Sequence, residues 1–359
     1  HVHVGARHRG RQADLEALRA GNDMILLPGN IGAAIDTIQQ ALAAGTLDQK
    51  QGDESVRRVL RAKYRMGLTQ PQRVEVANIR RDLNRPESQL LRRKPIENAL
   101  TLVRDRANIV GFPDLEKYRF ASLALGDTNR TVFQTNCGFF APVAHFNLPK
   151  IIDSAQFAHT LDTLRQYDVL LVSLHDMSRR PGTNFGLDSS QMSLIRRLSE
   201  QNTVVLTVFG NPYSLKFFDE AQVVLEAYNE DEATQEIAAQ ALFGAVDLKG
   251  LLPVTASPAA RYKQGISKTY ASKRLAYDLP EAAGLNSDTL RLMDTLVAEL
   301  IAAGAAPGCQ LLIARNGKIV WNKAYGRYTY DSLAPMVNPE NLYDLASITK
   351  VAASLISVM

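Results

Sequence analysis

The stretch Thr203–Pro212, which reads TVVLTVFGNP, decides the fold of the central part of this chain. Its aliphatic and β-branched residues run without a break and stop at a Gly-Asn-Pro turn, which is typical of a strand buried on both faces. Similar apolar runs occupy residues 120–125, 169–174 and 223–228, and segments of helical period such as residues 190–200 separate them. This alternation predicts an α/β fold with a mostly parallel sheet that helices cover on both faces.

The composition is that of a globular protein with more than one domain. The chain has 359 residues, 46% hydrophobic and 22% charged, with a formal net charge of +4, and this length predicts two or three domains. Its basic residues are spread along the sequence, which argues against nucleic-acid binding, and no apolar run is long enough for a membrane span. Cys137 and Cys309 belong to no Cys-x-x-Cys motif, and His1 and His3 have no carboxylate or cysteine nearby, so no metal or cofactor is predicted.

Residues 1–68 combine several helical patterns with one short apolar run. Helices are predicted over residues 13–21, 31–44 and 53–64, and a short buried strand over residues 24–28, MILLP. A single strand cannot form a sheet by itself. The region is therefore interpreted as the last part of a larger α/β unit.

Residues 69–95 are polar, arginine-rich and interrupted by prolines, which predicts a connector on the protein surface. A basic run near its end is interpreted as a solvated linker face, with a binding patch as the alternative. This run is Arg92, Arg93 and Lys94. The central domain is predicted over residues 96–256, with a helix-to-strand transition at its start, and a second linker over residues 257–280.

Residues 281–359 follow a different pattern. Residues 287–302 predict a long amphipathic helix capped by Ser287. Asn316–Gly317 lies between two apolar runs, which is a strong signal for a β-hairpin. A further apolar run begins at Val351 and continues to the end of the sequence, so we expect a helix that is cut within its domain.

Ser347-Ile348-Thr349-Lys350 is the strongest catalytic signature in the chain. Residues three positions apart share one face of a helix, so the Lys350 amine is expected beside the Ser347 hydroxyl. A partly desolvated amine takes the serine proton and activates the oxygen for attack on a carbonyl. Ser-x-x-Lys also occurs by chance, and the alternative is an ordinary helix N-terminus with an exposed lysine.

The context of this motif carries a family resemblance. The motif follows a predicted helix, an Asn-Gly hairpin and the segment Leu342–Ala346. In that order it resembles the opening of serine β-lactamases and penicillin-binding proteins, especially the class C and esterase-like group. The resemblance implies Ser347 as the nucleophile and Lys350 as its base.

His175-Asp176 follows the predicted strand at residues 169–174, at the end where α/β sheets often place ligands. An imidazole and a carboxylate there suggest an acid/base pair. Adjacent residues of an extended chain point in opposite directions, however. A hydrogen-bonded loop pair is therefore the favoured interpretation.

Motifs upstream of the hairpin resemble family 3 glycoside hydrolases, and they occur in the order of that family. They are Ala20–Met24, Phe209–Pro212, Phe243–Gly244 and Gly250–Pro253. The resemblance implies the end of a (β/α)8 barrel, then an α/β sandwich domain, then the first part of a β-lactamase-like α+β domain. Family 3 β-N-acetylglucosaminidases fused to a C-terminal β-lactamase-like domain have this arrangement.

The same resemblance implies hydrolysis of terminal β-N-acetylglucosamine from cell-wall or chitin-type glycans. It also implies an acyl or peptide substrate at Ser347 and a location in the cell envelope, the periplasm or outside the cell.

Retaining glycosidases need a carboxylate nucleophile and a separate proton donor, and residues 1–12 contain no Asp or Glu where the family has its nucleophile. We therefore expect an internal fragment without a complete active site of either kind. Two alternatives remain open, which are a carbohydrate-binding or dimerising scaffold and a serine esterase or peptidase alone.

Overall fold

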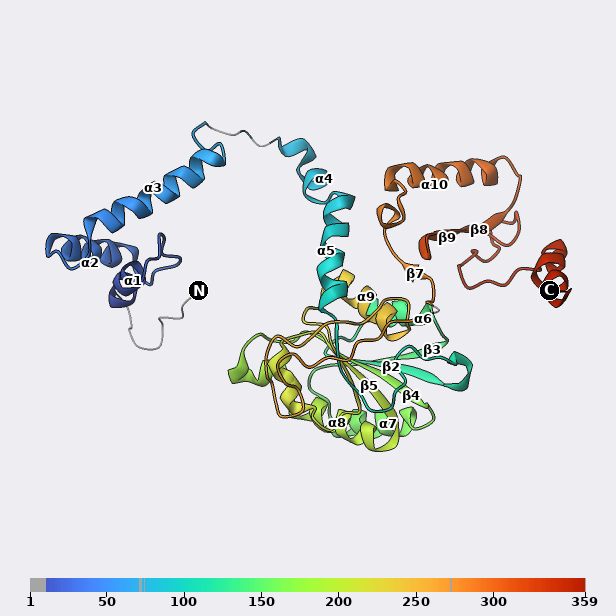
Figure 1. Ribbon diagram of the computed structural model, residues 1–359. Coiled ribbons are helices and arrows are strands. Elements are labelled where there is room, and N and C mark those ends of the chain that lie inside the picture. Colours follow the sequence, from blue (N-terminus) through green and yellow to red (C-terminus); the bar gives the residue numbers. More distant parts are fainter. Residues whose placement is uncertain (1–10, 71–72, 74, 272, 359) are drawn as a thin grey trace. The chain divides into compact units, whose positions relative to one another are not determined.

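The computed structural model describes residues 11–70, 73, 75–271 and 273–358 (Figure 1). Its contacts divide the chain into two compact units, with the division between Asp82 and Leu83. Helices in the described ranges are either too short or too polar to cross a membrane. The His1–His3 pair lies outside the described residues, and the finer domain limits given above stay a prediction.

The first unit is helical over its described residues. Its helices are α1 (Arg11–Arg19), α2 (Ile31–Ala43), α3 (Gln49–Arg65), the 3-10 turn η2 (Val76–Asn78) and most of α4 (Ile79–Leu83). Asn30 and Asp48 cap α2 and α3 by accepting backbone N–H groups, as their short polar side chains favour. Leu15, Ala41 and Leu47 form a small core between these helices.

The strand predicted at residues 24–28 is wrong. This segment consists of bends and irregular backbone, and the side chains of Leu26 and Leu27 are 84% and 88% exposed. A strand is held by hydrogen bonds to a partner strand. Unit 1 has no second strand among its described residues, so the apolar run has nothing to pair with.

The second unit is built around a six-stranded sheet of order β1-β6-β5-β4-β2-β3. All neighbouring strands are parallel except β1, which is antiparallel to β6. The strands are β1 (Thr101–Asp105), β2 (Phe120–Leu125), β3 (Val143–Leu148), β4 (Val169–Leu174), β5 (Thr203–Val208) and β6 (Val223–Glu226). The predicted α/β class with a mostly parallel sheet is therefore confirmed.

Helices cover both faces of this sheet (Figure 1). They are α6 (Val132–Gly138), α7 (Ser154–Leu164), α8 (Ser189–Gln201) and α9 (Glu232–Leu242), and the helix α5 (Pro86–Ala99) packs against α9. Leu171 packs on the side of α6 and α9, and its neighbour Leu170 on the side of α7 and α8, because successive side chains of a strand alternate. Both are fully buried, and each burial of this kind stabilises the fold by about 1.5–3 kcal/mol. This two-sided burial explains the unbroken apolar runs of the sequence.

Strand β3 was not predicted from the sequence. It forms an edge of the sheet, and each of its residues is only half-buried. Its sequence, VAHFNL, mixes polar and apolar residues. An edge strand that is partly open to solvent needs no continuous apolar run, so the pattern that reveals β2, β4 and β5 is missing here.

The basic run before β1 is part of helix α5, and one of its members is buried. Arg93 is 6% exposed, and its guanidinium forms ion pairs with Glu236 (Nη1–Oε2 2.6 Å) and Asp278 (Nε–Oδ1 3.0 Å). The interpretation of Arg93 as a solvated residue is therefore wrong, because two carboxylates far away in the sequence draw it inwards. The interpretation holds for Arg92 and Lys94, which are exposed.

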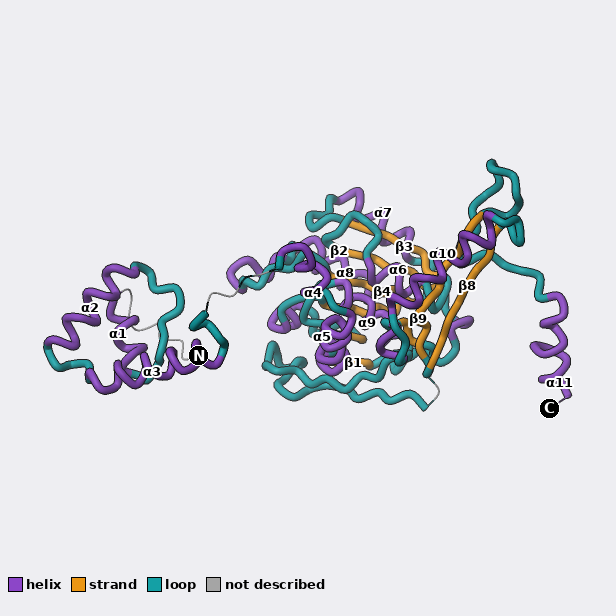
Figure 2. The backbone as a smooth tube through the Cα atoms, turned by 90° about the horizontal axis from the view of Figure 1, so that it is seen from above, coloured by secondary structure: helices purple, strands orange, loops and turns teal. Residues whose placement is uncertain are grey.

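The C-terminal part of this unit contains the three-stranded sheet β7-β9-β8. Its strands are β7 (Ala276–Tyr277), β8 (Gly308–Arg315) and β9 (Lys318–Gly326), and the helix α10 (Ser287–Ala302) precedes β8. Figure 2 shows β8 and β9 side by side, and they pair antiparallel. The predicted hairpin is confirmed. Asn316 and Gly317 both have positive φ, at 54° and 74°, as the predicted tight turn requires.

Two further predictions in this region differ from the structure in detail. The cap of α10 is Asn286, whose side chain accepts the Thr289 N–H, while Ser287 donates its hydroxyl to Glu281 instead. The predicted linker packs against the larger sheet. Its Ile266 N–H donates to the carbonyl of Leu102 and so covers the outer edge of β1.

Candidate functional sites

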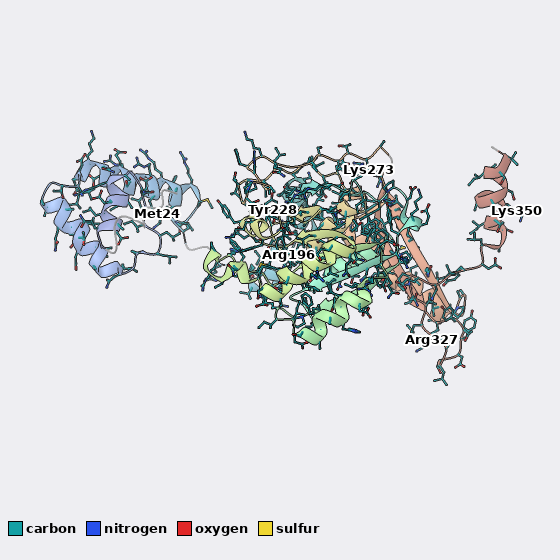
Figure 3. All side chains as sticks on the ribbon, turned by 90° about the horizontal axis from the view of Figure 1, so that it is seen from below. Met24, Arg196, Tyr228, Lys273, Arg327 and Lys350 are labelled. Atoms are coloured by element: carbon teal, nitrogen blue, oxygen red, sulfur yellow. The ribbon has the colours of Figure 1, made fainter. Side chains whose placement is uncertain are left out.

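The Ser347–Lys350 motif lies on a short helical segment near the C-terminus. The 3-10 turn η7 (Ala346–Ile348) leads into the π-helix η8 (Lys350–Leu355) and the turn α11 (Ile356–Val358). The Lys350 Nζ donates a hydrogen bond to Ser347 Oγ over 2.9 Å, and both residues are exposed. Figure 3 marks Lys350 on this segment.

This contact agrees with the Ser-x-x-Lys spacing of the sequence, but the direction of its hydrogen bond is not the one that catalysis requires. In it the amine donates to the hydroxyl, whereas a general base accepts the serine proton. The Lys350 side chain is exposed, so the described residues do not enclose the motif in a pocket. The catalytic roles of Ser347 and Lys350 stay a prediction.

A second group of polar residues gathers where the parallel strands end. Since β4, β5 and β6 are parallel, their carboxyl ends lie at one edge of the sheet. His175 follows β4, Asn211 lies shortly after β5, and Tyr228 and Glu230 follow β6. Figure 3 marks Tyr228 at this edge.

His175 and Asp176 point in different directions, as the extended chain predicts. The His175 side chain is fully buried, and its ring nitrogens contact Ser173 Oγ (Nε2, 2.8 Å) and Glu230 Oε1 (Nδ1, 3.1 Å). Asp176 is exposed and pairs with Lys150 over 2.7 Å. The structure therefore does not bring these two side chains together as an acid/base pair.

Glu230 is held by two groups of the protein. Its Oε1 contacts the buried His175 ring, and its Oε2 accepts the backbone N–H of Asp176 over 2.7 Å. The Glu230 side chain stays 33% exposed. A fixed carboxylate thus faces solvent at the carboxyl edge of the sheet.

The chain of contacts Ser173–His175–Glu230 has the order hydroxyl, imidazole and carboxylate that serine hydrolases use. Ser173, however, is fully buried within β4. Because no substrate reaches its hydroxyl, the chain does not supply a nucleophile. Its effect is to fix the imidazole and, through the imidazole, the carboxylate of Glu230.

A pocket of about 510 Å³ opens beside Glu230. We call it the Glu230 pocket. Its walls include Ser178, Arg179, Gly210, Asn211, Tyr228 and Glu230. Sequence reasoning singled out Asn211 only as part of a turn and missed Glu230. The position of Glu230 just after an apolar strand was the available signal.

Glu226, the last residue of β6, is a buried carboxyl group beneath this edge. Its side chain is fully buried, Oε1 accepts the Tyr228 N–H over 2.8 Å, and Oε2 has no partner among the described residues. Burial raises its pKa well above the ordinary value. Over the described parts of the chain, no cluster of three or more His, Cys, Asp or Glu side chains is arranged to hold a metal ion.

The fold is that of an α/β domain with a mostly parallel sheet and polar residues at its carboxyl edge. Residues 13–287 match the family described as Glycosyl hydrolase family 3 C-terminal domain. The chain therefore belongs to this family.

Two solved structures are similar to the chain in fold. One is Beta-glucoside phosphorylase BglX, with a TM-score of 0.51 and 17% identity, covering 71% of this chain and 48% of that chain. The other is the β-glucosidase EmGH1 from Erythrobacter marinus, with a TM-score of 0.51 and 17% identity, covering 72% of this chain and 45% of that chain. At these identities the likeness concerns the fold alone.

Two curated proteins match shorter parts of the chain. A Putative D-alanyl-D-alanine carboxypeptidase from Escherichia coli O157:H7 is 41% identical over 81 residues, which is 21% of this chain and 18% of that protein. Protein flp from Staphylococcus aureus (strain NCTC 8325 / PS 47) is 34% identical over 71 residues, which is 20% of this chain and 14% of that protein. The chain thus spans less than a fifth of these curated relatives.

Proposed function

We propose that this chain takes part in family 3 glycoside hydrolysis, in which terminal β-linked N-acetylglucosamine is removed from cell-wall or chitin-type glycans. The observation that carries the proposal is the family match over residues 13–287. The choice of sugar is supported by the arrangement of the chain. Its family 3 motifs precede the Ser347–Lys350 motif, and this order resembles family 3 β-N-acetylglucosaminidases fused to a β-lactamase-like domain. With a glycan of this kind as substrate, we expect the protein in the cell envelope or outside the cell.

Within such an enzyme the six-stranded domain acts as a scaffold with a polar edge. Family 3 chemistry requires a carboxylate nucleophile and a separate proton donor. Residues 1–12 hold no carboxylate where the family has its nucleophile. We therefore expect the 359-residue chain to support the reaction without performing it alone.

Turnover of aryl glycosides tests this proposal. A protein in which this chain follows a family 3 barrel with its carboxylate nucleophile is expected to cleave an aryl β-N-acetylglucosaminide faster than the matching aryl β-glucoside, and the 359-residue chain alone is expected to cleave neither. Preference for the glucoside would contradict the choice of sugar, and turnover by the 359-residue chain would contradict the scaffold role. Glycan affinity of the chain, without turnover by either protein, would favour the scaffold alternative alone.

We also propose a second activity, acyl transfer or hydrolysis at Ser347 with Lys350 as base. The 2.9 Å contact between Lys350 Nζ and Ser347 Oγ supports this role, as does the partial similarity to a protein described as a carboxypeptidase. A lysine close to a serine hydroxyl is the arrangement that activates this nucleophile, once the amine is neutral.

Covalent labelling tests the second activity. A fluorophosphonate probe is expected to label Ser347, as read by intact-mass and peptide mass spectrometry. Ser347→Ala and Lys350→Ala are each expected to abolish the label, and the neighbouring Thr349→Ala is the matched control that keeps it. Equal labelling of the wild type and Lys350→Ala would show that Lys350 is not the base.

A further inference from the structure

The geometry points to a second pocket, beside the edge strand β3, as a binding site for a carboxylate that carries an apolar group. Arg130 binds the carboxylate, and His145 is the positioning residue that holds Arg130 in place. We call this cavity the Arg130 pocket, and its walls include Tyr118, Arg130, Phe139, Pro142 and His145. The inference does not rest on the proposed function, because all its arguments come from this pocket.

The Arg130 pocket lies at the opposite end of the sheet from the Glu230 pocket. Phe120 and Val143, the first residues of β2 and β3, line it, and so does Tyr167, just before β4. These three strands are parallel, so the three positions share the amino edge of the sheet. The volume of about 1160 Å³ is slightly above the range of roughly 300–1,000 Å³ that is usual for small-molecule sites. The pocket therefore has room for an apolar group beside a carboxylate.

The hydrogen bonds of the His145 ring determine its tautomer. Arg130 Nη2 lies 2.9 Å from His145 Nε2, and His145 Nδ1 lies 2.7 Å from Ser122 Oγ. A guanidinium can only donate, so Nε2 accepts, and the ring proton is on Nδ1, which donates to Ser122. Burial and the neighbouring Arg130 lower the pKa of His145 to about 4. The ring is therefore uncharged at neutral pH and keeps its acceptor for Arg130.

Two buried side chains hold this ring in turn. Ser122 and Gln134 are each 0% exposed, and Gln134 Nε2 donates to Ser122 Oγ over 3.2 Å. Gln134 Oε1 accepts the Thr131 N–H over 3.0 Å in the capping box of α6, which sets the orientation of the amide. This series of hydrogen bonds runs from the start of a helix to the Arg130 guanidinium. The fold itself thus holds the guanidinium, and a fixed group loses little side-chain entropy on binding.

The charge of Arg130 is not neutralised by a carboxylate among the described residues. In that part of the chain its hydrogen-bond partner is the uncharged His145 ring, and it forms no ion pair. Arg119, in the same wall, differs because its Nη2 pairs with Asp168 over 3.0 Å. A guanidinium has five N–H donors, so Arg130 keeps donors for a ligand. Their planar fork matches the two oxygens of a carboxylate.

Apolar surface surrounds this guanidinium. The Phe139 side chain is 47% exposed, and Tyr118, Phe140 and Pro142 also line the pocket and are not fully buried. Removing such surface from water on binding is favourable. A ligand with an aromatic or aliphatic group next to its carboxylate covers these side chains, whereas a small inorganic anion leaves them in water.

The other charges of the pocket favour a single negative charge on the ligand. Glu116 and Glu340 line the walls together with Arg119 and Arg130, so two carboxylates face two guanidinium groups. A second negative charge on the ligand meets these glutamates and is repelled. A monocarboxylate therefore fits the pocket better than a phosphate dianion.

An NMR titration of the isotope-labelled 359-residue chain with N-acetyl-L-phenylalanine tests the proposal. The amide signals of Gly138 and His145 are expected to shift together and to saturate. N-acetyl-L-phenylalanine amide has the same shape without the charge and is expected to bind roughly tenfold more weakly or worse, the loss that follows from one hydrogen bond to a charged group.

Arg130→Gln is expected to weaken binding of the acid by the same factor and to remove the preference for the acid over the amide. Arg196→Gln is the matched control, because it removes one positive charge from α8, outside the pocket (Figure 3). This variant is expected to bind like the wild type.

The role of His145 is tested by a pair of variants. His145→Gln brings an amide oxygen near the position of Nε2 and is expected to keep most of the affinity, whereas His145→Leu has no acceptor for Arg130 and is expected to lose it. A purely structural role would lower the thermal stability of both variants, with no rescue of affinity by glutamine. Circular dichroism and thermal melting check the fold of every variant.

Three outcomes overturn the proposal. One is the absence of a saturable shift in the wild type at millimolar N-acetyl-L-phenylalanine. Another is equal affinity for the acid and the amide, and the third is equal affinity of the wild type and Arg130→Gln for the acid. Each of them leaves the proposed glycosidase function standing, because that function is judged by turnover of aryl glycosides.

Discussion

Arg93 and Arg92 are neighbours in the sequence with opposite environments, and this contrast gives a sharp test of the packing. The Arg93 side chain is 8% exposed and pairs with Glu236 and Asp278, whereas the Arg92 side chain is 60% exposed and, among the described residues, pairs with Asp231. Replacing each arginine by alanine therefore removes one buried and one surface ion-pair system from the same helix.

The expected size of the Arg93→Ala effect follows from what its partners lose. Asp278 is 5% exposed and keeps Lys318 and the Leu279 N–H as partners, while Glu236 is 36% exposed and regains water. Breaking a buried ion pair costs about 3–5 kcal/mol of unfolding free energy. Because Lys318 still compensates the charge of Asp278 in Arg93→Ala, we expect the low end of this range, about 3 kcal/mol. For a domain of this size that loss lowers Tm by roughly 6–12 °C. Arg92→Ala is expected to cost about 0–1 kcal/mol.

Urea unfolding measures both variants. The single tryptophan, Trp321, lines the same pocket as Arg93 and Asp278, so its fluorescence reports this region while far-ultraviolet circular dichroism reports the whole chain. A separate early fluorescence transition in Arg93→Ala would show that the C-terminal sheet loosens before the larger sheet unfolds. Losses within about 1 kcal/mol for both variants would refute the reasoning, because Arg93 would then behave as a surface residue.

Three further predictions concern single positions, each measured by urea unfolding. Burial raises the pKa of Glu226 well above 4.5, so the stabilising contribution of this residue is complete below about pH 4.5 and is lost as pH rises through the folded pKa. Glu226→Gln is expected to match the wild type at acid pH and to be increasingly more stable than the wild type as pH rises. A stability difference that is constant with pH would contradict this prediction. Burial and a neighbouring arginine lower the pKa of His145 from 6.5 to about 4, so its contribution to stability is present above pH 6.5 and is lost as pH falls toward 4. His145→Gln is expected to reduce the loss of unfolding free energy over this pH range, and an unchanged pH dependence would count against the prediction. A Cβ on Gly250 would lie 2.3 Å from the Ala99 carbonyl oxygen, so Gly250→Ala is expected to lower the free energy of unfolding by about 1–3 kcal/mol. Gly182→Ala is the control with little change, because its Cβ would meet nothing within 4 Å.

The sequence reveals those parts of the fold whose patterns are local. Strands β2, β4 and β5 are apolar because both faces are buried, and Asn316–Gly317 marks its turn because few residues tolerate positive φ. Strand β3 stays hidden because an edge strand carries no such run.

Long-range contacts could not be predicted in the same way. Arg93 is 143 residues from Glu236, and His175 is 55 residues from Glu230. Nothing near Arg93 in the sequence distinguishes it from Arg92, and only the folded chain shows which of the two is buried. The Glu230 pocket escaped prediction for the same reason, since three separate strands contribute its walls.

The most direct test of the central claim is the turnover of aryl glycosides. A protein in which this chain follows a family 3 barrel with its carboxylate nucleophile is expected to cleave an aryl β-N-acetylglucosaminide faster than the matching aryl β-glucoside. Preference for the glucoside, or no turnover of either glycoside, would contradict the account.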